Sequence, residues 1–263
     1  MAEMFESASA YDNMMGRWST RLAPLFVDFA GVRDGGRILD VGCGTGSLVQ
    51  AVADVARGSE IVGIDPARPF IEHCRQRFGG PRFTFNCGNG MELPYPDSLF
   101  DHALSLLVLQ FVPQPGKAAR EMRRVTRPGG TVAAATWDSA NLELSAAFWD
   151  EAVKLNSAAR ARVPGARHCN SKGQLAELWQ ATGFENAEET ALEIPTDFAS
   201  FDDYWRPFTG GAGPQGAYVA TLTPEQRDAL RDGLRRRLLG NRPDGPFSLR
   251  ARALAVRGTV RKQ

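Results

Sequence analysis

One glycine-rich segment constrains the fold of this chain more than any other feature. It reads Ile38-Leu-Asp-Val-Gly-Cys-Gly-Thr-Gly-Ser-Leu48, where an apolar run ends in a carboxylate and glycine then recurs at every second position. Glycine permits a tight turn with positive φ and lets a ligand approach the backbone without a Cβ clash. An apolar stripe at helical spacing follows. The segment predicts a buried strand, a ligand-binding turn and the start of a helix.

The spacing and the charge of this turn restrict its ligand. Gly42, Gly44 and Gly46 do not fit the G-x-G-x-x-G dinucleotide pattern, because position 47 is serine. Asp40 would repel a pyrophosphate, whereas it attracts an ammonium group. A nicotinamide oxidoreductase is therefore disfavoured, and we expect a cationic ligand at residues 40–46, which include Cys43.

A second carboxylate follows the next predicted strand. Asp65 ends residues 60–65 and directly precedes Pro66. Because the first two strands of such folds lie side by side, its carboxylate is placed to accept both hydroxyls of a ribose. Capping of the following helix is a second role, and the two are compatible.

Short apolar runs alternate with helical patterns along residues 34–136. This alternation is typical of βαβ units and a parallel sheet, so we expect an α/β fold with helices on both faces. Two further strands are expected at residues 185–194 and 248–257. The first five strands are predicted at residues 37–41, 60–65, 82–86, 100–107 and 131–136.

Four motifs in this order resemble the class I S-adenosylmethionine-dependent methyltransferases. The other two are residues 88–101 and the turn Arg127-Pro-Gly-Gly-Thr131. The resemblance implies a Rossmann-like, mostly parallel seven-stranded sheet with an antiparallel last strand. It also implies S-adenosylmethionine as cofactor, bound without a metal. The cofactor contacts expected from it are Arg17, Asp40, Gly42, Cys43, Gly44, Gly46, Asp65, Pro66, Asn89, Gly90, Met91 and Leu106.

Within that class, the chain resembles the small-molecule, quinone-biosynthesis-like enzymes of methyltransferase type 11. Its opening, Tyr11-Asp-Asn-Met-Met-Gly-Arg-Trp-Ser19, is similar to a segment that folds over the cofactor in those enzymes. The resemblance implies that Arg17 pairs with the methionine carboxylate. Asn89, which stands where the family usually has aspartate, should border the adenine.

Aromatic residues gather in the segments expected at the carboxyl edge of the sheet. A flat or apolar methyl acceptor fits such a wall, and the contacts that we expect are Tyr11, Phe111, Trp137, Tyr204 and Trp205. His168 and Asp138 are candidates for a general base, although a plain loop histidine and a helix cap are their alternatives. The glycine-rich residues 210–216 are predicted to form a moving lid.

Four regions are predicted along the chain. They are an N-terminal helical cover (1–33), the methyltransferase core (34–195), a helical insertion (196–246) and the last core strand (247–263). The cover and the insertion should cap the carboxyl edge of the sheet. Scattered cysteines and the absence of a signal-like N-terminus or an apolar span lead us to expect a cytoplasmic protein. The sequence says nothing about its oligomeric state.

Two other functions stay open at this point. An RNA methyltransferase would explain the basic C-terminal part, because residues 227–263 hold eleven Lys and Arg against three Asp. The net charge of +1, however, gives no general attraction to a polyanion, so nucleic acid is not the expected partner. A regulatory protein that binds the cofactor without catalysis is the other alternative.

Overall fold

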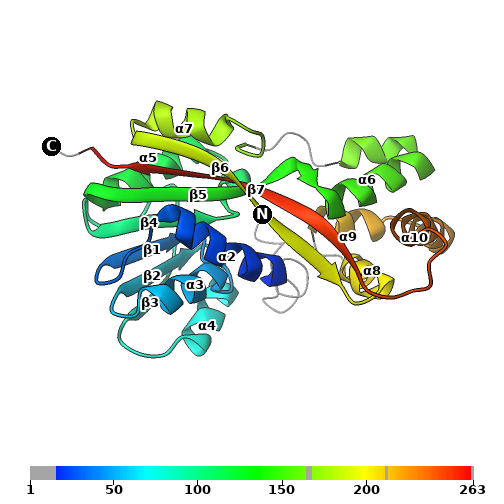
Figure 1. The fold of residues 1–263 in the computed structure, drawn as a ribbon, viewed down its shortest axis with the longest axis horizontal. Helices are drawn as coiled ribbons and strands as arrows, with labels where there is room; N and C mark the ends of the chain where they lie inside the picture. Colours follow the sequence, from blue (N-terminus) through cyan, green and yellow to red (C-terminus); the bar gives the residue numbers. More distant parts are fainter. Residues whose placement is uncertain (1–15, 164–167, 211–212, 262–263) are drawn as a thin grey trace.

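The computed structural model describes residues 16–163, 168–210 and 213–261. Its strands form one seven-stranded sheet in the order β3-β2-β1-β4-β5-β7-β6 (Figure 1). Only β7 runs antiparallel to its neighbours, so the predicted mostly parallel sheet with a reversed last strand is confirmed. The strands are β1 Arg37–Val41, β2 Glu60–Asp65, β3 Phe83–Cys87, β4 Phe100–Leu106, β5 Thr126–Leu142, β6 Glu185–Phe198 and β7 Phe247–Thr259.

Helices cover both faces of this sheet, as expected for a Rossmann-like fold. One face carries α2, α3 and α4, and the opposite face carries α5 and α7, while the remaining helices lie beyond the carboxyl ends of the strands (Figure 1). The helices are α2 Arg17–Ala30, α3 Ser47–Val55, α4 Arg68–Arg77, η3 Leu109–Phe111, α5 Pro115–Val125, α6 Glu143–Leu155, η4 Ser157–Arg162, α7 Gln174–Thr182, α8 Phe201–Thr209, α9 Gly213–Val219 and α10 Pro224–Leu239.

Alternating side chains of the strands supply the two apolar layers. In β1, Ile38 joins the layer under α2 and α3, whereas Leu39 and Val41 join the layer under α5 and α7. Because successive side chains of a strand point to opposite faces, the continuous apolar run is explained by burial on both sides.

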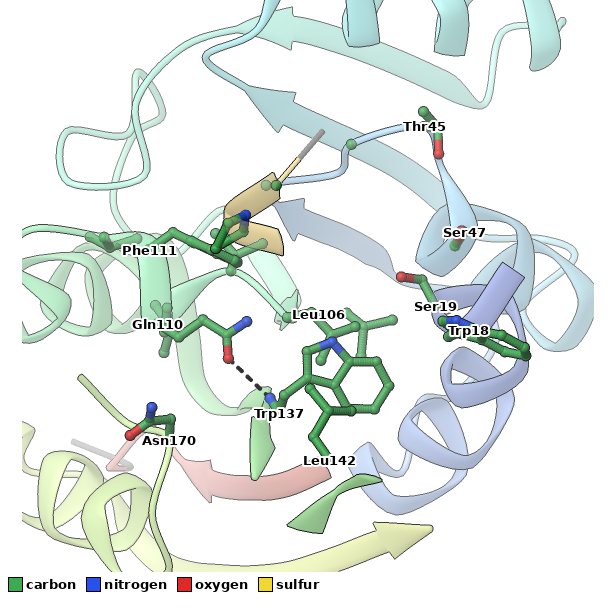
Figure 2. Close-up of a pocket in the computed structure, with 18 of the residues that line it drawn as sticks. Trp18, Ser19, Thr45, Ser47, Leu106, Gln110, Phe111, Trp137, Leu142 and Asn170 are labelled. Atoms are coloured by element: carbon green, nitrogen blue, oxygen red, sulfur yellow. Dashed lines mark hydrogen bonds between the residues drawn. The ribbon is translucent and has the colours of Figure 1, made fainter. Parts of the chain in front are cut away.

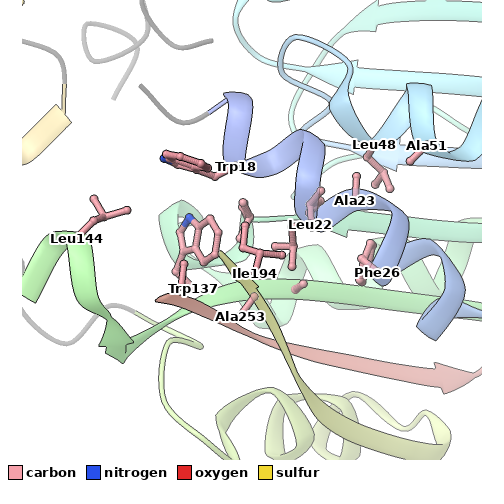
Figure 3. Packing of buried hydrophobic residues seen from close by; sticks show 14 of the residues in the cluster. Trp18, Leu22, Ala23, Phe26, Leu48, Ala51, Trp137, Leu144, Ile194 and Ala253 are labelled. Carbon is pink, nitrogen blue, oxygen red and sulfur yellow. The ribbon is translucent and has the colours of Figure 1, made fainter. Parts of the chain in front are cut away.

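The N-terminal helix α2 packs on the face of the sheet beside α3. Its Trp18, Leu22 and Phe26 are each at most 2% exposed and point into the core (Figure 3). Residues 17–30 therefore belong to the core layer instead of capping the carboxyl edge, and only the first turn of α2 reaches that edge. The reason is the amphipathic spacing, which gives the helix one long apolar face.

A helical cap sits at the carboxyl edge. Strands β6 and β7 form a long antiparallel ribbon, and α8, α9 and α10 are inserted between them at its far end (Figure 1). Helix α6, which was assigned to the core, packs against α10 and joins this cap. The predicted lid loop is wrong for residues 213–216, which begin α9.

Three simpler features complete the description. The four cysteines are free, and of these only Cys87 is exposed. Across the described ranges, no helix is both long and apolar enough to cross a bilayer. The same part of the chain brings together no three His, Cys, Asp or Glu side chains suited to a metal ion.

The packing of α2 predicts a contrast between two leucines of one helix. Leu22 is 0% exposed, whereas Leu25 is 43% exposed. We expect Leu22→Ala to lower the free energy of unfolding by about 2–5 kcal/mol, because it leaves a cavity in the core. Leu25→Ala should change it by about 0.5 kcal/mol or less. Urea denaturation measures both, and equal losses would show that α2 is not part of the core.

Candidate active site

The glycine-rich turn after β1 is held against the end of β2. The Ile64 carbonyl accepts the backbone N–H of Gly42 at 2.7 Å and that of Cys43 at 3.1 Å. The N–H of Gly44 donates to the Asp65 carboxylate at 3.0 Å. Since β1 and β2 are parallel neighbours, both predicted binding segments form one rigid unit.

Each glycine of the turn is required for a different reason. All three have positive φ, but a Cβ at Gly44 would meet nothing within 4 Å, so this position faces open space. A Cβ at Gly42 would lie 2.4 Å from Val108, and one at Gly46 would lie 2.4 Å from Phe78. Gly46 does not line the cavity described below. Its role as a cofactor contact therefore stays a prediction, and what the structure shows is that Gly46 leaves room for the ring of Phe78.

Asp40 is a buried carboxylate without a partner. It is 2% exposed, and neither carboxylate oxygen makes a hydrogen bond to the described residues. Burial, and then the nearby charge of Asp65, raise the pKa of Asp40 well above its usual value. Burying an unpaired charge is costly, so a cationic group of a ligand would compensate for it.

Asp65 is both a helix-start acceptor and a part of the cavity wall. Its Oδ1 accepts the N–H of Ala67 at 2.8 Å, and its Oδ2 accepts that of Gly44. Burial raises the pKa of Asp65, while these two backbone hydrogen bonds oppose the rise. Each carboxylate oxygen keeps one lone pair free for a ligand hydroxyl, so capping and ligand binding are compatible.

A single cavity of about 730 Å³ joins the turn to the cap. Side chains from β4, β5 and α2 surround it, with Trp137 and Leu106 on one wall and Trp18 on another (Figure 2). Tyr11 lies outside the described residues. The predicted contacts that line the cavity are Arg17, Asp40, Gly42, Cys43, Gly44, Asp65, Pro66, Asn89, Gly90, Met91, Leu106, Phe111, Trp137 and Tyr204.

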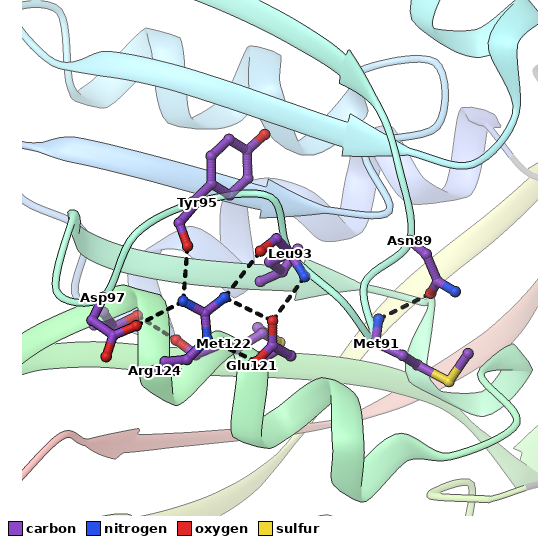
Figure 4. Close-up of polar contacts among 9 residues, drawn as sticks. Asn89, Met91, Leu93, Tyr95, Asp97, Glu121, Met122 and Arg124 are labelled. Atoms are coloured by element: carbon purple, nitrogen blue, oxygen red, sulfur yellow. Dashed lines mark hydrogen bonds and ion pairs between the residues drawn. The ribbon is translucent and has the colours of Figure 1, made fainter.

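The loop that carries residues 89–91 is fixed by a network around Arg124 of α5. This guanidinium donates to the carbonyl oxygens of Leu93 at 2.9 Å and Tyr95 at 2.8 Å (Figure 4). It also pairs with Glu121, whose carboxylate accepts the N–H of Leu93 at 2.8 Å. The hydrogen bond from Arg124 lowers the pKa of Glu121, so the network stays charged. The loop is thus held rigid where it meets the cavity.

Asn89 uses part of its side chain within this loop. Its Oδ1 accepts the N–H of Met91 at 2.9 Å. A carbonyl oxygen can accept a second hydrogen bond, so the predicted acceptance from an adenine amino group is compatible with the loop geometry.

Arg17 already has a partner in the cap. Its Nη1 lies 3.0 Å from Oδ1 and 3.1 Å from Oδ2 of Asp203 in α8, and the guanidinium lies 4.3 Å from the ring centroid of Trp18. This pair joins α2 to the insertion. Binding of a methionine carboxylate by Arg17 stays a prediction, and it would require the guanidinium to share or exchange Asp203.

Three other predicted site residues do not line the cavity. Asp138 is buried and pairs with Arg252 at 2.6 Å, so its carboxylate is neutralised away from the site and is not suited to act as a base. His168 is exposed and is no part of the wall. Trp205 is 4% exposed and packs beside Phe208 in the core of the cap. Helical spacing turns Tyr204 toward the cavity and its neighbour away from it.

Tyr204 lines the cavity with its ring and anchors the cap with its hydroxyl. The O–H donates to the carbonyl oxygen of Leu144 at 3.0 Å, and burial raises the pKa of Tyr204. It is therefore a neutral wall of the cavity and not a proton acceptor.

Several polar residues of the wall were missed by sequence reasoning. Gln110 is 8% exposed and lies on η3, just after β4. Asn170 and Ser139 are also part of the wall, and the hydroxyl of Ser139 donates to the carbonyl oxygen of Asn170. A lone glutamine inside the apolar run of residues 104–112 was the available signal. Asn170 and Ser139 carry no such local signal, because tertiary packing alone brings their segments together.

This strand order places a glycine-rich turn and two carboxylates at the carboxyl edge of the sheet. Residues 39–134 match the family described as a methyltransferase domain.

Relatives and solved structures agree with this assignment. Demethylmenaquinone methyltransferase of Symbiobacterium thermophilum is 33% identical over 139 residues, which are 49% of this chain and 55% of the relative. The chain spans about half the length of the curated relatives it matches.

Two solved structures share the fold. YcgJ of Bacillus subtilis superposes with a TM-score of 0.61 at 20% identity, covering 92% of this chain and 99% of that one. Phosphoethanolamine N-methyltransferase 2 of Haemonchus contortus, bound to phosphomonomethylethanolamine and S-adenosylhomocysteine, gives 0.59 at 18% identity, covering 97% and 57%.

The geometry of the turn predicts unequal costs for two alanine substitutions. We expect Gly46→Ala to lower the free energy of unfolding by about 2–4 kcal/mol, because it adds backbone strain and a clash with Phe78. Gly44→Ala should cost about 1–2 kcal/mol, since the new methyl group meets no atom and only the positive φ is unfavourable. Thermal and urea denaturation compare the two variants; a larger loss for Gly44→Ala would contradict this assignment of roles.

The unpartnered Asp40 predicts a pH dependence of stability. The unfolded chain ionises this carboxyl near pH 3.9, whereas the folded chain holds the proton to a higher pH. The folded state therefore loses stability as pH rises between those two values. Urea denaturation from about pH 4 to pH 8 should show wild type weakening relative to Asp40→Asn. A difference that does not vary with pH would contradict the burial of an ionising Asp40.

Proposed function

We propose that this chain binds S-adenosylmethionine and transfers its methyl group to a small, partly apolar or aromatic molecule. One observation carries the proposal: a single cavity runs from the carboxylate-flanked glycine turn to the aromatic cap. One end suits a cationic nucleoside, and the other suits a flat acceptor.

The cofactor end offers a matching contact for each part of the ligand. Asp40 would compensate the ammonium charge, and the free lone pairs of Asp65 would accept the ribose hydroxyls. Ile64 and Met91 line the cavity with apolar surface suited to the adenine. The open space at Gly44 allows the ligand to approach the backbone.

The bound cofactor supplies the methyl group as an electrophile, so no covalent nucleophile of the protein is required. The chain's own task is to position the acceptor and to exclude water. The described wall offers no unpaired histidine or carboxylate base in the cap half, which favours an acceptor that needs little help in losing a proton. Phe111, Trp137 and Tyr204 supply its apolar surface.

The charges of the wall restrict the acceptor further. Among the described residues, the wall carries the carboxylates Asp40, Asp65 and Asp150, and the one guanidinium of Arg17, which is paired with Asp203. A phosphate group needs cationic partners. A phosphorylated acceptor, such as the one bound by the Haemonchus contortus enzyme, therefore fits this wall poorly. An uncharged aromatic acceptor, in keeping with the demethylmenaquinone relative, fits better.

An RNA acceptor is the weaker alternative. In the basic C-terminal part, five arginines are neutralised by carboxylates of neighbouring elements. These ion pairs neutralise the charge that a phosphate backbone would need, and Arg17 is the one basic residue that lines the cavity in the described part of the chain. The five are Arg237, Arg250, Arg252, Arg257 and Arg261.

Calorimetry of Asp65→Ala tests the cofactor assignment. Wild type should bind S-adenosylmethionine and S-adenosylhomocysteine. The variant should bind either ligand about 100-fold to 10,000-fold more weakly, because it loses two charge-assisted hydrogen bonds that are each worth roughly 1.5–3 kcal/mol. Asp54→Ala, on the exposed side of α3, is the matched control and should bind as wild type does.

Three results would count against this proposal. Unchanged affinity in Asp65→Ala would remove the ribose assignment. NADH binding of similar strength would overturn the choice of cofactor. Cofactor binding without transfer of a labelled methyl group to any small molecule or RNA of an extract would favour a regulatory protein instead.

A further inference from the structure

We propose that Gln110 recognises the methyl acceptor: its side-chain NH₂ donates a hydrogen bond to an acceptor oxygen beside the methylated atom. The acceptor class would then be an uncharged aromatic ketone, enol or phenol. This inference rests on the proposed function and adds a specificity-determining residue to it.

The orientation of the Gln110 amide is set by the backbone. Its Oε1 accepts the N–H of Trp137 in β5 at 3.0 Å (Figure 2). A backbone N–H can only donate, so the oxygen must be the atom that faces Trp137. The NH₂ group is thereby turned the other way, and within residues 16–163, 168–210 and 213–261 the one hydrogen bond of this side chain is the one that Oε1 accepts.

The position of this amide is that of an acceptor contact. Gln110 lies on η3, four residues after β4 ends at Leu106, and β5 supplies its partner. The amide nitrogen points away from Trp137 into the space bordered by Phe111 and Leu106 (Figure 2). Ligands of open α/β sheets bind beyond the carboxyl ends of the strands, and this is such an edge.

Two other polar side chains of the cap half are already engaged, whereas Nε1 of Trp149, which also lines the cavity, has no partner among the described residues. The hydroxyl of Tyr204 donates to Leu144, and Nε2 of Gln215 donates to the hydroxyl of Ser145 at 3.1 Å. Gln110 thus presents a donor that the fold itself does not use. Gln110 is held in a residue position that is only 8% exposed, so a ligand oxygen placed beside its NH₂ group gains an oriented hydrogen bond that an apolar analogue cannot make.

The charge of the cavity wall restricts which kind of acceptor oxygen can accept the hydrogen bond from the Gln110 NH₂ group. An amide NH₂ carries no net charge, and the guanidinium of Arg17 is held by Asp203. A carboxylate or phosphate of an acceptor would therefore lie near Asp40 and Asp65 without a cation. A carbonyl, enol or phenol oxygen needs only the single donor that Gln110 offers.

The test uses full-length protein saturated with S-adenosylhomocysteine and two probes, 1-tetralone and tetralin, which differ by one carbonyl oxygen. Binding is followed by competition nuclear magnetic resonance. Wild type should bind 1-tetralone about tenfold more tightly than tetralin. In Gln110→Met this preference should fall to about onefold, with tetralin affinity unchanged.

Gln110→Glu is the sharper variant, because it keeps the size and the acceptor for Trp137 while replacing the NH₂ by an oxygen. It should lose 1-tetralone binding and retain tetralin binding. Gln180→Glu, at an exposed position of α7, controls for the added charge and should behave as wild type. The side-chain amide resonances that are missing in Gln110→Met should shift downfield when 1-tetralone is added to wild type.

The outcomes separate the two proposals. A tetralone preference that survives in Gln110→Met, or wild type that does not prefer tetralone, overturns the role of Gln110 while S-adenosylhomocysteine binding leaves the proposed function standing. Failure of wild type to bind S-adenosylhomocysteine overturns both. Retained S-adenosylhomocysteine affinity in each variant shows that the variant is folded.

Discussion

The junction between β1 and β2 is the constraint on which the rest of this structure depends. One carbonyl oxygen, that of Ile64, accepts two N–H groups of the turn, and the carboxylate of Asp65 accepts a third. These bonds fix a backbone that glycine alone can follow. The same junction leaves Asp40 buried with no hydrogen-bond partner among the described residues, so ionisation of this carboxyl is costly unless a cationic group lies beside it.

The cavity divides its two tasks between different kinds of surface. At the junction, backbone N–H groups and carboxylates present polar groups in a fixed geometry, which suits the cofactor that we propose. In the cap, rings and a few oriented amides make a less polar wall. This division follows from the order of elements in the chain: the parallel core supplies the carboxyl edge, and α6 together with the residues inserted between β6 and β7 supplies the cover.

Local patterns in the sequence were enough to predict the sheet and the glycine-rich turn that lines one end of the cavity. The turn and Asp65 can be recognised from a few adjacent residues, because the end of a strand and a run of glycines determine the local backbone conformation. The pairing of Arg17 with Asp203 joins residues 186 apart, and that of Asp138 with Arg252 joins residues 114 apart. No local pattern reports such contacts, so a free arginine and a free carboxylate were expected where the fold has neutral pairs.

The sequence also could not predict the direction in which individual side chains point. Tyr204 and Trp205 are adjacent in one short helix, yet only the tyrosine reaches the cavity. Gln110 is polar within an apolar run, and its meaning becomes visible only when β5 places a backbone N–H beside it. Both cases depend on the packing of neighbouring elements, which composition and spacing do not encode.

The insertion leaves and re-enters the sheet at one point. Phe198, the last residue of β6, pairs in register with Phe247, the first residue of β7. Their rings are stacked, with 5.1 Å between the ring centroids. The match to the methyltransferase domain family ends at residue 134, well before this point. Because the entropy of closing a loop grows only slowly with its length, such a segment can be lengthened, shortened or exchanged at little cost to the sheet. Evolution can therefore change the surface that faces the acceptor by exchanging residues 199–246, while the sheet and the glycine-rich turn stay the same.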